Sequence, residues 1–253
     1  PPKGICMDIT VLGEAKFPTP LSYHVGDKAR VVSDIIIDPD NPPKVDGMSF
    51  ELAGPRERLC FDPKKTRAGI VTCGGLCPGI NNVIRSLVLQ LHHGYGVYEI
   101  LGFRDGYQGL DPWRGADPIP LSPTVVEDIH KEGGSILNTS RGPVDISVAV
   151  DNLIRRKIDI LFVVGGDGTQ RGGADIFQEA ERRGHALAVV GVPFPPAWDA
   201  FWGSCDSPLG LEFWKFRSLL PWQRCTPLRK NKVRSRVRVC GWGAWILLLP
   251  KKC

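Results

Sequence analysis

The sequence predicts an α/β fold, a parallel sheet covered by helices. Short apolar runs alternate with helix-patterned segments between residues 67 and 193, and two of these runs end in glycine-rich turns. One run, at 159–164, is apolar after Asp159, as expected for a parallel strand that is buried on both faces.

Residues 1–66 are expected to form an N-terminal extension with one strand-like segment, "RVVSDIII" (30–37). In the regular part, "AGIVTC" (68–73) is β-rich and apolar and predicts the first strand. The glycine-rich "GGLCPG" follows it. Apolar residues at helical spacing then predict a helix over 81–94, with Gly94 as its stop.

The next three elements are a strand and two helices. "YEILGF" (98–103) predicts a strand. Ser122 and Pro123 are typical of an N-cap and a first helical residue, so a helix is expected from there to about Lys131. A further amphipathic helix is expected over 145–157.

The last predicted elements are a strand at 159–164, a helix at 170–184 and a strand at 186–192. Ligands of open parallel sheets bind at the carboxyl ends of the strands. The glycine turns at 74–79 and 165–168 are both expected at that edge.

Composition excludes some classes of protein. The chain has 253 residues, 42% of them hydrophobic and 23% charged, which is typical of a globular domain in water. No apolar run reaches the roughly 18 residues that a membrane span needs. Because no secretory signal is recognised and the cysteines form no zinc-ligand pattern, the eight cysteines are interpreted as reduced thiols. A cytoplasmic location is therefore expected.

The glycine turns indicate phosphate binding. Backbone N–H groups can approach phosphate oxygens only where no Cβ intervenes, and the N-terminus of a following helix adds donors and positive charge. Asp167 would repel phosphates, so its natural use is to hold Mg²⁺. A single turn of this kind is as well explained by tight packing of helix on strand; two at one sheet edge favour a nucleotide triphosphate with its metal.

A polar segment, "GGSILNTSRGPVD" (133–145), lies between the two turns in the sequence. Arg141 alone would be read as a solvated surface charge. Near two phosphate-type turns, it can neutralise a phosphoryl group during transfer.

Four motifs follow one another along the chain: "GIVTCGGLCPGINNVIR", "ILGFRDGYQGL", "GGSILNTSRG" and "VVGGDGTQRGGA". Together, and in this order, they resemble the phosphofructokinase family. "VLGEAKFPTPL" and "FELAGPRERLCFDP" resemble the plant-type, ATP-dependent branch. The GGDG motif alone also occurs in NAD kinases and diacylglycerol kinases, but these lack the GGxxPGxN element.

The resemblance covers roughly residues 10–193 and implies a nucleotide-binding domain over 67–193. It implies Mg²⁺ at Asp167, and the implied ATP contacts are Gly75, Arg141, Gly142, Gly166, Asp167, Gly168 and Thr169. Pyrophosphate-using relatives have GGDD in place of GGDG, so by this resemblance Gly168 favours ATP as the phosphoryl donor. Asn138 stands where the family more often has glycine, and it is expected to reshape the turn before Thr139.

After Pro193 the resemblance stops. The family continues with a T-I-D-N-D motif, and its first aspartate, the catalytic base, falls on Ala197 here. Asp199 matches the second acid, but Pro195 and Pro196 give a different backbone path. The sugar-phosphate motif is absent, so no catalytic residue is assigned and most of the second domain is expected to be missing.

Residues 194–253 differ in composition from the rest. They hold six of the seven tryptophans, and eleven Lys or Arg against three Asp or Glu. We interpret them as out-of-frame or intron-derived sequence, an aberrant tail rather than a folded domain. The basic run at 229–239 could bind nucleic acid, but a solvated basic tail is favoured because no RNA-binding fold surrounds it.

By resemblance, the expected function is 6-phosphofructokinase activity, phosphoryl transfer from MgATP to fructose 6-phosphate in glycolysis, impaired in this chain. The alternative is a non-catalytic nucleotide-binding or regulatory form. The resemblance also implies a homo-oligomer. Because plant-type relatives occur in both cytosol and plastid, it adds the plastid as the alternative to a cytoplasmic location.

Overall fold

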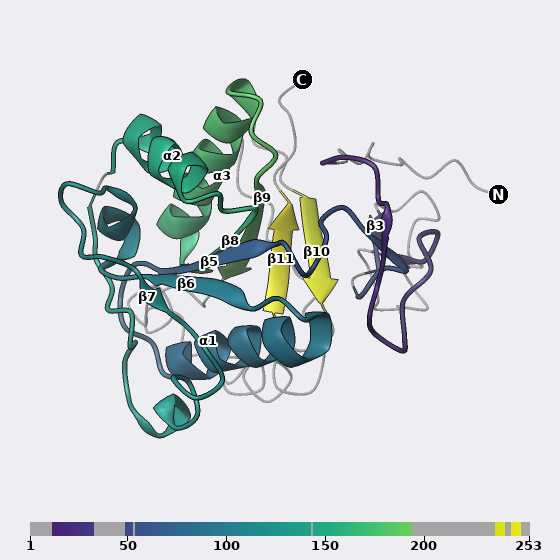
Figure 1. Cartoon of the computed structure of the whole chain (residues 1–253), viewed down its shortest axis with the longest axis horizontal. Coiled ribbons are helices and arrows are strands. Elements are labelled where there is room, and N and C mark those ends of the chain that lie inside the picture. Colours follow the sequence, from purple (N-terminus) through teal and green to yellow (C-terminus); the bar gives the residue numbers. More distant parts are fainter. Residues whose placement is uncertain are drawn as a thin grey trace, which may run out of the picture.

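The computed structural model describes residues 12–32, 49–52, 54–142, 144–193, 236–240 and 244–248. Its main feature is a five-stranded sheet in the order β7-β6-β5-β8-β9 (Figure 1). The strands are β5 (Arg67–Thr72), β6 (Glu99–Phe103), β7 (Ile119–Pro120), β8 (Ile160–Gly165) and β9 (Ala188–Pro193).

The predicted parallel sheet is confirmed for four of these strands. β5 pairs in parallel with β6 and β8, and β8 pairs in parallel with β9. The four predicted strand segments are all present, shifted by one or two residues. The short β7 runs antiparallel to β6, which the sequence pattern does not predict.

Helices cover both faces of the sheet (Figure 1). α1 (Ile80–Leu89) lies on one face, and α2 (Ile146–Arg155) and α3 (Asp167–Arg182) lie on the other. Strand β8 alternates between the two cores: Leu161 packs toward α2 and α3, and Phe162 packs toward α1. Burial on both faces is why β8 has no polar residue.

The predicted helix over 81–94 is present, but it changes pitch. α1 ends at Leu89 and continues as a π-helix, η1 (Gln90–Tyr95). The predicted stop at Gly94 is wrong, because the chain ends the helix at Gly96 in the left-handed region (φ 72°).

The predicted helix over 122–131 is also wrong. Ser122 does act as a cap, since its Oγ accepts from the Val125 N–H at 3.3 Å. Only turns follow, however, before a short 3₁₀ helix, η3 (Ile129–Lys131). The physical reason is the run of β-branched residues from Thr124 to Val126, which loses side-chain freedom in a helix.

Three small antiparallel pairs lie outside the main sheet. β1 (Phe17–Pro18) pairs with β4 (Arg58–Leu59), and β2 (Arg30–Val32) pairs with β3 (Ser49–Glu51). The first three residues of the predicted strand at 30–37 are therefore confirmed, and 33–37 lie outside the described residues. In the tail, β10 (Arg236–Cys240) and β11 (Ala244–Leu248) form a hairpin, and β11 contacts β9.

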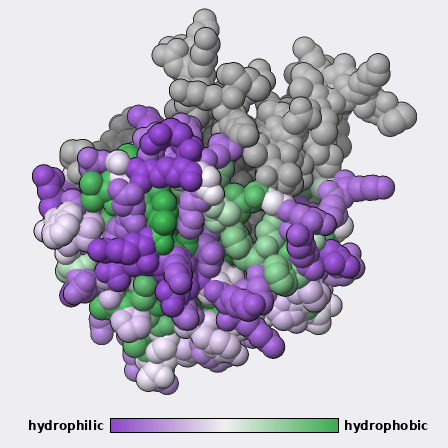
Figure 2. Space-filling model, turned by 45° about the horizontal axis from the view of Figure 1, so that its top comes forward, coloured by the Kyte–Doolittle hydropathy of each residue, from purple (hydrophilic) through white to green (hydrophobic). Residues whose placement is uncertain are grey.

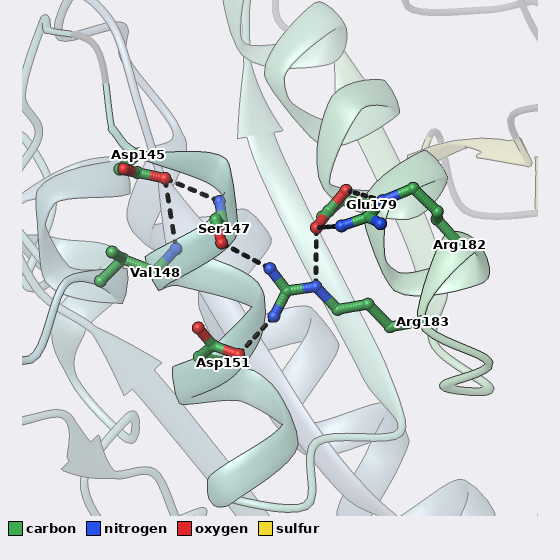
Figure 3. A network of polar contacts seen from close by, with 7 residues as sticks. All are labelled: Asp145, Ser147, Val148, Asp151, Glu179, Arg182 and Arg183. Carbon is green, nitrogen blue, oxygen red and sulfur yellow. Dashed lines mark hydrogen bonds and ion pairs between the residues drawn. The ribbon is translucent and has the colours of Figure 1, made fainter.

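An ionic network joins α2 to α3 (Figure 3). The Arg183 guanidinium pairs with Asp151 and donates to the Ser147 hydroxyl at 2.6 Å, and its Nε donates to Glu179 at 2.6 Å. Arg182 also donates to Glu179, through Nε at 2.8 Å and Nη2 at 2.6 Å. Hydrogen bonds from Arg182 and Arg183 lower the pKa of Glu179 to about 2.

Glu179→Gln is expected to reduce stability at neutral pH more than at pH 2.5. Because the folded-state pKa of Glu179 is depressed, its stabilising contribution is present above the ordinary value of 4.5 and is lost as the pH falls toward 2. Urea unfolding midpoints at pH 7 and pH 2.5 measure this. Glu127→Gln, an exposed carboxylate on the opposite face, is the control; a Glu179→Gln effect that is equal at both pH values would contradict the prediction.

The described surface seen in Figure 2 is mostly hydrophilic, with separate apolar spots. The large exposed apolar side chains include Trp113, Leu76 and Tyr98, on three different segments. Among the described residues, no helix has the length and apolar content that crossing a bilayer requires.

Candidate phosphate-binding site

The candidate site lies where the chain changes direction across the sheet. After β5 the chain passes through α1 to β6 on one side, and it later returns to β8 on the other side of β5. The carboxyl ends of β5 and β8 are adjacent, since Thr72 pairs with Val164 and the Cys73 N–H donates to the Val164 carbonyl at 2.9 Å. Such a switch point is where open α/β sheets bind ligands.

The first glycine turn leaves β5 at this edge. Gly74 (φ 94°) and Gly79 (φ 93°) both adopt the left-handed region, and Gly79 is the N-cap residue of α1. A Cβ built on Gly75 would lie 2.9 Å from Nη2 of Arg141. The absence of a side chain at Gly75 therefore lets the Arg141 guanidinium lie against this turn, so two of the predicted residues are brought together.

The segment that carries Arg141 is bonded to the end of β5. The Thr72 hydroxyl donates to the Asn138 carbonyl at 2.6 Å, and the Gly74 N–H donates to the Ser140 carbonyl at 3.2 Å. Thr72 is fully buried. Within the part of the chain that the structure describes, Arg141 forms no ion pair, so its positive charge is available to an anion.

The second glycine turn is shorter than predicted. Gly165 is the last residue of β8, and α3 begins at Asp167, three residues before the predicted start at 170. Only Gly166 lies between strand and helix, in an extended conformation (φ −79°, ψ −167°).

The glycines of this turn differ in what they contact. A Cβ on Gly165 would lie 2.4 Å from Oγ1 of Thr169 and 2.5 Å from the Cys73 carbonyl oxygen. In contrast, apart from chain neighbours and the helix's own backbone, no described atom lies within 4 Å of a Cβ built at Gly166 or Gly168. Packing therefore explains why residue 165 is glycine. It does not explain glycine at positions 166 and 168, where the described residues leave open space.

This open space adjoins the N-terminus of α3. Gly166 provides no side-chain cap, and the first helical hydrogen bond runs from the Gln170 N–H to the Gly166 carbonyl at 3.0 Å. The preceding N–H groups have no partner within the helix, which creates an anion-binding end. Asp167 is the first helical residue, and Thr169 is 6% exposed.

Comparison with known proteins identifies the family. The family model described as Phosphofructokinase matches residues 67–195, about half of the chain. The chain belongs to the phosphofructokinase family. Its α/β fold, a mostly parallel sheet flanked by helices, is the phosphofructokinase-like fold.

Curated relatives carry the name ATP-dependent 6-phosphofructokinase. The one from Trypanosoma cruzi is 51% identical over 60% of this chain and 31% of its own length. The one from Borreliella burgdorferi is 43% identical over 73% of this chain and 43% of its own length. The Arabidopsis thaliana protein named "ATP-dependent 6-phosphofructokinase 4, chloroplastic" is 50% identical over 58% of this chain and 27% of its own length. The chain thus spans less than half of the length of these relatives. Among solved structures, Saccharomyces cerevisiae phosphofructokinase aligns with a TM-score of 0.43 at 24% identity, over 61% of this chain and 25% of that one.

Sequence reasoning missed one residue that supports the candidate site, Tyr107. It lies on a 3₁₀ helix, η2 (Gly106–Leu110), and its hydroxyl donates to the Thr169 carbonyl. A Cβ on Gly172 would lie 2.6 Å from the Tyr107 ring, so the ring packs directly on the α3 backbone. Burial raises the pKa of Tyr107, and the charges of Cys73 and Asp175 add to this. Adjacent glycines inside a helical pattern, Gly172 and Gly173, were the available signal.

The remaining predicted residue, Gly142, is exposed. It lies near Gln108: a Cβ built on Gly142 would be 3.5 Å from the Gln108 Nε2. The three described cysteines, Cys60, Cys73 and Cys77, form no disulfide with one another. Burial raises the pKa of Cys73 to about 12, which keeps it protonated and unsuited to binding a metal.

Proposed function

We propose that this chain is the nucleotide-binding half of an ATP-dependent 6-phosphofructokinase and that it binds MgATP across the ends of β5 and β8. The observation that carries the proposal is the open space at Gly166 and Gly168, beside the N-terminus of α3. A phosphate chain placed there meets backbone N–H groups without steric obstruction.

Each proposed contact has a physical role. Gly75 and Gly166 let the main chain approach phosphate oxygens, and Gly142 continues the segment that carries Arg141. Arg141 compensates negative charge on the phosphoryl group. Thr169, in the first turn of α3, completes the set, although its burial favours a backbone contact.

We propose that Asp167 serves Mg²⁺. Only its place in the fold is described, at the first position of α3 beside the proposed phosphates. Magnesium commonly takes one or two carboxylates together with substrate phosphates and water, so one acid in this position fits the ion. Among the described residues there is no cluster of three or more His, Cys, Asp or Glu side chains, and such a site needs none. When bound, the ion supplies charge neutralisation between phosphates.

We propose ATP rather than pyrophosphate as the phosphoryl donor. An aspartate at position 168 would introduce a second negative charge and fill the open space beside Gly168. Glycine leaves that space for the rest of a nucleotide. The names of the curated relatives agree with this assignment.

For the acceptor, we propose that fructose 6-phosphate is the substrate of the intact enzyme and that this chain alone transfers phosphoryl groups poorly. The base position holds Ala197, which cannot accept the proton of a sugar hydroxyl. This residue lies outside the described part of the chain. The same observation favours the second candidate, a non-catalytic form that binds nucleotide and joins full-length subunits in a homo-oligomer. A cytoplasmic location stays a prediction, with the plastid as the alternative.

The test is calorimetric titration of the purified chain with ATP, with and without Mg²⁺. Asp167→Asn is expected to weaken Mg²⁺-dependent ATP affinity about tenfold while leaving metal-free binding little changed, since one charged contact to the ion is lost. Asp175→Asn, an exposed acid farther along α3, is the matched control. Unchanged metal-dependent affinity in Asp167→Asn would contradict the metal assignment, and rapid ADP release that depends on fructose 6-phosphate would contradict the impaired transfer.

A further inference from the structure

Two residues other than glycine face each other in the left-handed region beside the candidate site. Asp105 (φ 60°) follows β6, and Asn138 (φ 55°) lies in the segment that leads to Arg141. The Asn138 Nδ2 donates to Oδ1 of Asp105 at 3.0 Å. Few residue types other than glycine adopt this conformation readily, and asparagine and aspartate are the main exceptions.

Backbone contacts extend this pair toward the site. The Ser140 hydroxyl donates to the Asp105 carbonyl at 2.6 Å, and the Asp105 N–H donates to the Leu137 carbonyl at 2.8 Å. Ser140 in turn accepts from Gly74, next to the glycine that Arg141 covers. A continuous set of hydrogen bonds therefore runs from the end of β6 to the turn after β5.

We propose that the Asn138–Asp105 hydrogen bond is a positioning contact that holds Arg141 over Gly75 before nucleotide binds. Glycine at position 138 would permit the same backbone conformation and keep the bonds of Ser140 and of the main chain, but it would remove the side-chain bond to Asp105. Asparagine permits the conformation and adds the bond to Asp105. Because ordering a loop opposes binding, a segment ordered in advance raises affinity. This inference rests on the proposed function of the site.

The experiment uses glycine variants, which keep the left-handed conformation and remove only the side-chain bond. Asn138→Gly and Asp105→Gly are each expected to raise the Kd for MgATP about three- to tenfold, and the double variant no further. In an Arg141→Ala background, Asn138→Gly is expected to change nothing, because the contact acts through Arg141. Asp105→Asn, which keeps an acceptor oxygen, is expected to retain wild-type affinity.

Lys157→Gly is the matched control. Lys157 is the third described non-glycine residue with positive φ (55°), and it precedes the amino end of β8, at the far edge of the sheet from the site. Its replacement is expected to leave the affinity unchanged. Equal affinity in Asn138→Gly and wild type, or additive losses in the double variant, would overturn the proposal.

A second measurement needs no nucleotide. Trypsin cleavage after Arg141, followed by mass spectrometry, is expected to be faster in Asn138→Gly than in Lys157→Gly if the segment is tethered. Equal cleavage rates would overturn the tether. If wild type fails to bind MgATP but the cleavage rates differ, the proposed function fails while the tether stands.

Discussion

Gly165→Ala is expected to destabilise the domain by about 3 kcal/mol or more, because its new Cβ would overlap the neighbouring backbone. The Cys73 carbonyl oxygen would lie 2.5 Å away, and a backbone atom directly after the central strand β5 cannot rotate aside as the Thr169 side chain can. Stability is measured by urea unfolding followed by far-UV circular dichroism.

Gly168→Ala is expected to have the opposite profile. Its Cβ meets no described atom, and alanine is a better helix former, so stability is kept or raised by up to about 1 kcal/mol. The affinity for MgATP, in contrast, is expected to fall at least about tenfold, because the methyl group occupies space proposed for the nucleotide. Wild-type ATP affinity in Gly168→Ala would remove the steric basis of the proposed site.

Phe103→Ala is expected to cost about 3–5 kcal/mol, the largest single loss in the core. Phe103 is fully buried at the end of β6, in the cluster that joins the sheet to α2 and α3. Its ring lies against Gly69 of the neighbouring strand β5. Its removal leaves a cavity that a packed sheet cannot close. Trp113→Ala is the control for loss of an aromatic ring, since Trp113 is 87% exposed, and it is expected to change stability by less than about 0.5 kcal/mol. Similar losses for both variants would contradict this account of the core.

The sequence was sufficient to predict the four parallel strands of the main sheet because they are short apolar runs, two of which end in glycine-rich turns. β8, for example, is buried on both faces and reads as an unbroken hydrophobic segment. The prediction of a helix from Ser122 was wrong because two local signals conflict there. Ser122 is a good capping residue, but the β-branched residues that follow it disfavour a helix. The antiparallel β7 is two residues long and gives no period to detect.

At the candidate site, the sequence indicated the right turns but not the role of each glycine. Gly165 and Gly168 are equivalent in the motif, yet one is enclosed by backbone and the other faces open space. The contact of Tyr107 with Thr169 joins residues 62 positions apart, and the contact of Asp105 with Asn138 joins residues 33 positions apart. No local sequence pattern indicates such pairings.

The central place of β5 has a consequence for synthesis on the ribosome. The N–H of Arg67 donates to the Asp159 carboxylate, 92 residues later in the sequence. Strand β5 pairs with β8, which is translated about as much later. Until β8 emerges, one edge of β5 stays unpaired in the nascent chain, where non-native pairing can compete. The two phosphate-type turns therefore come together late in translation, after nearly the whole domain has been made.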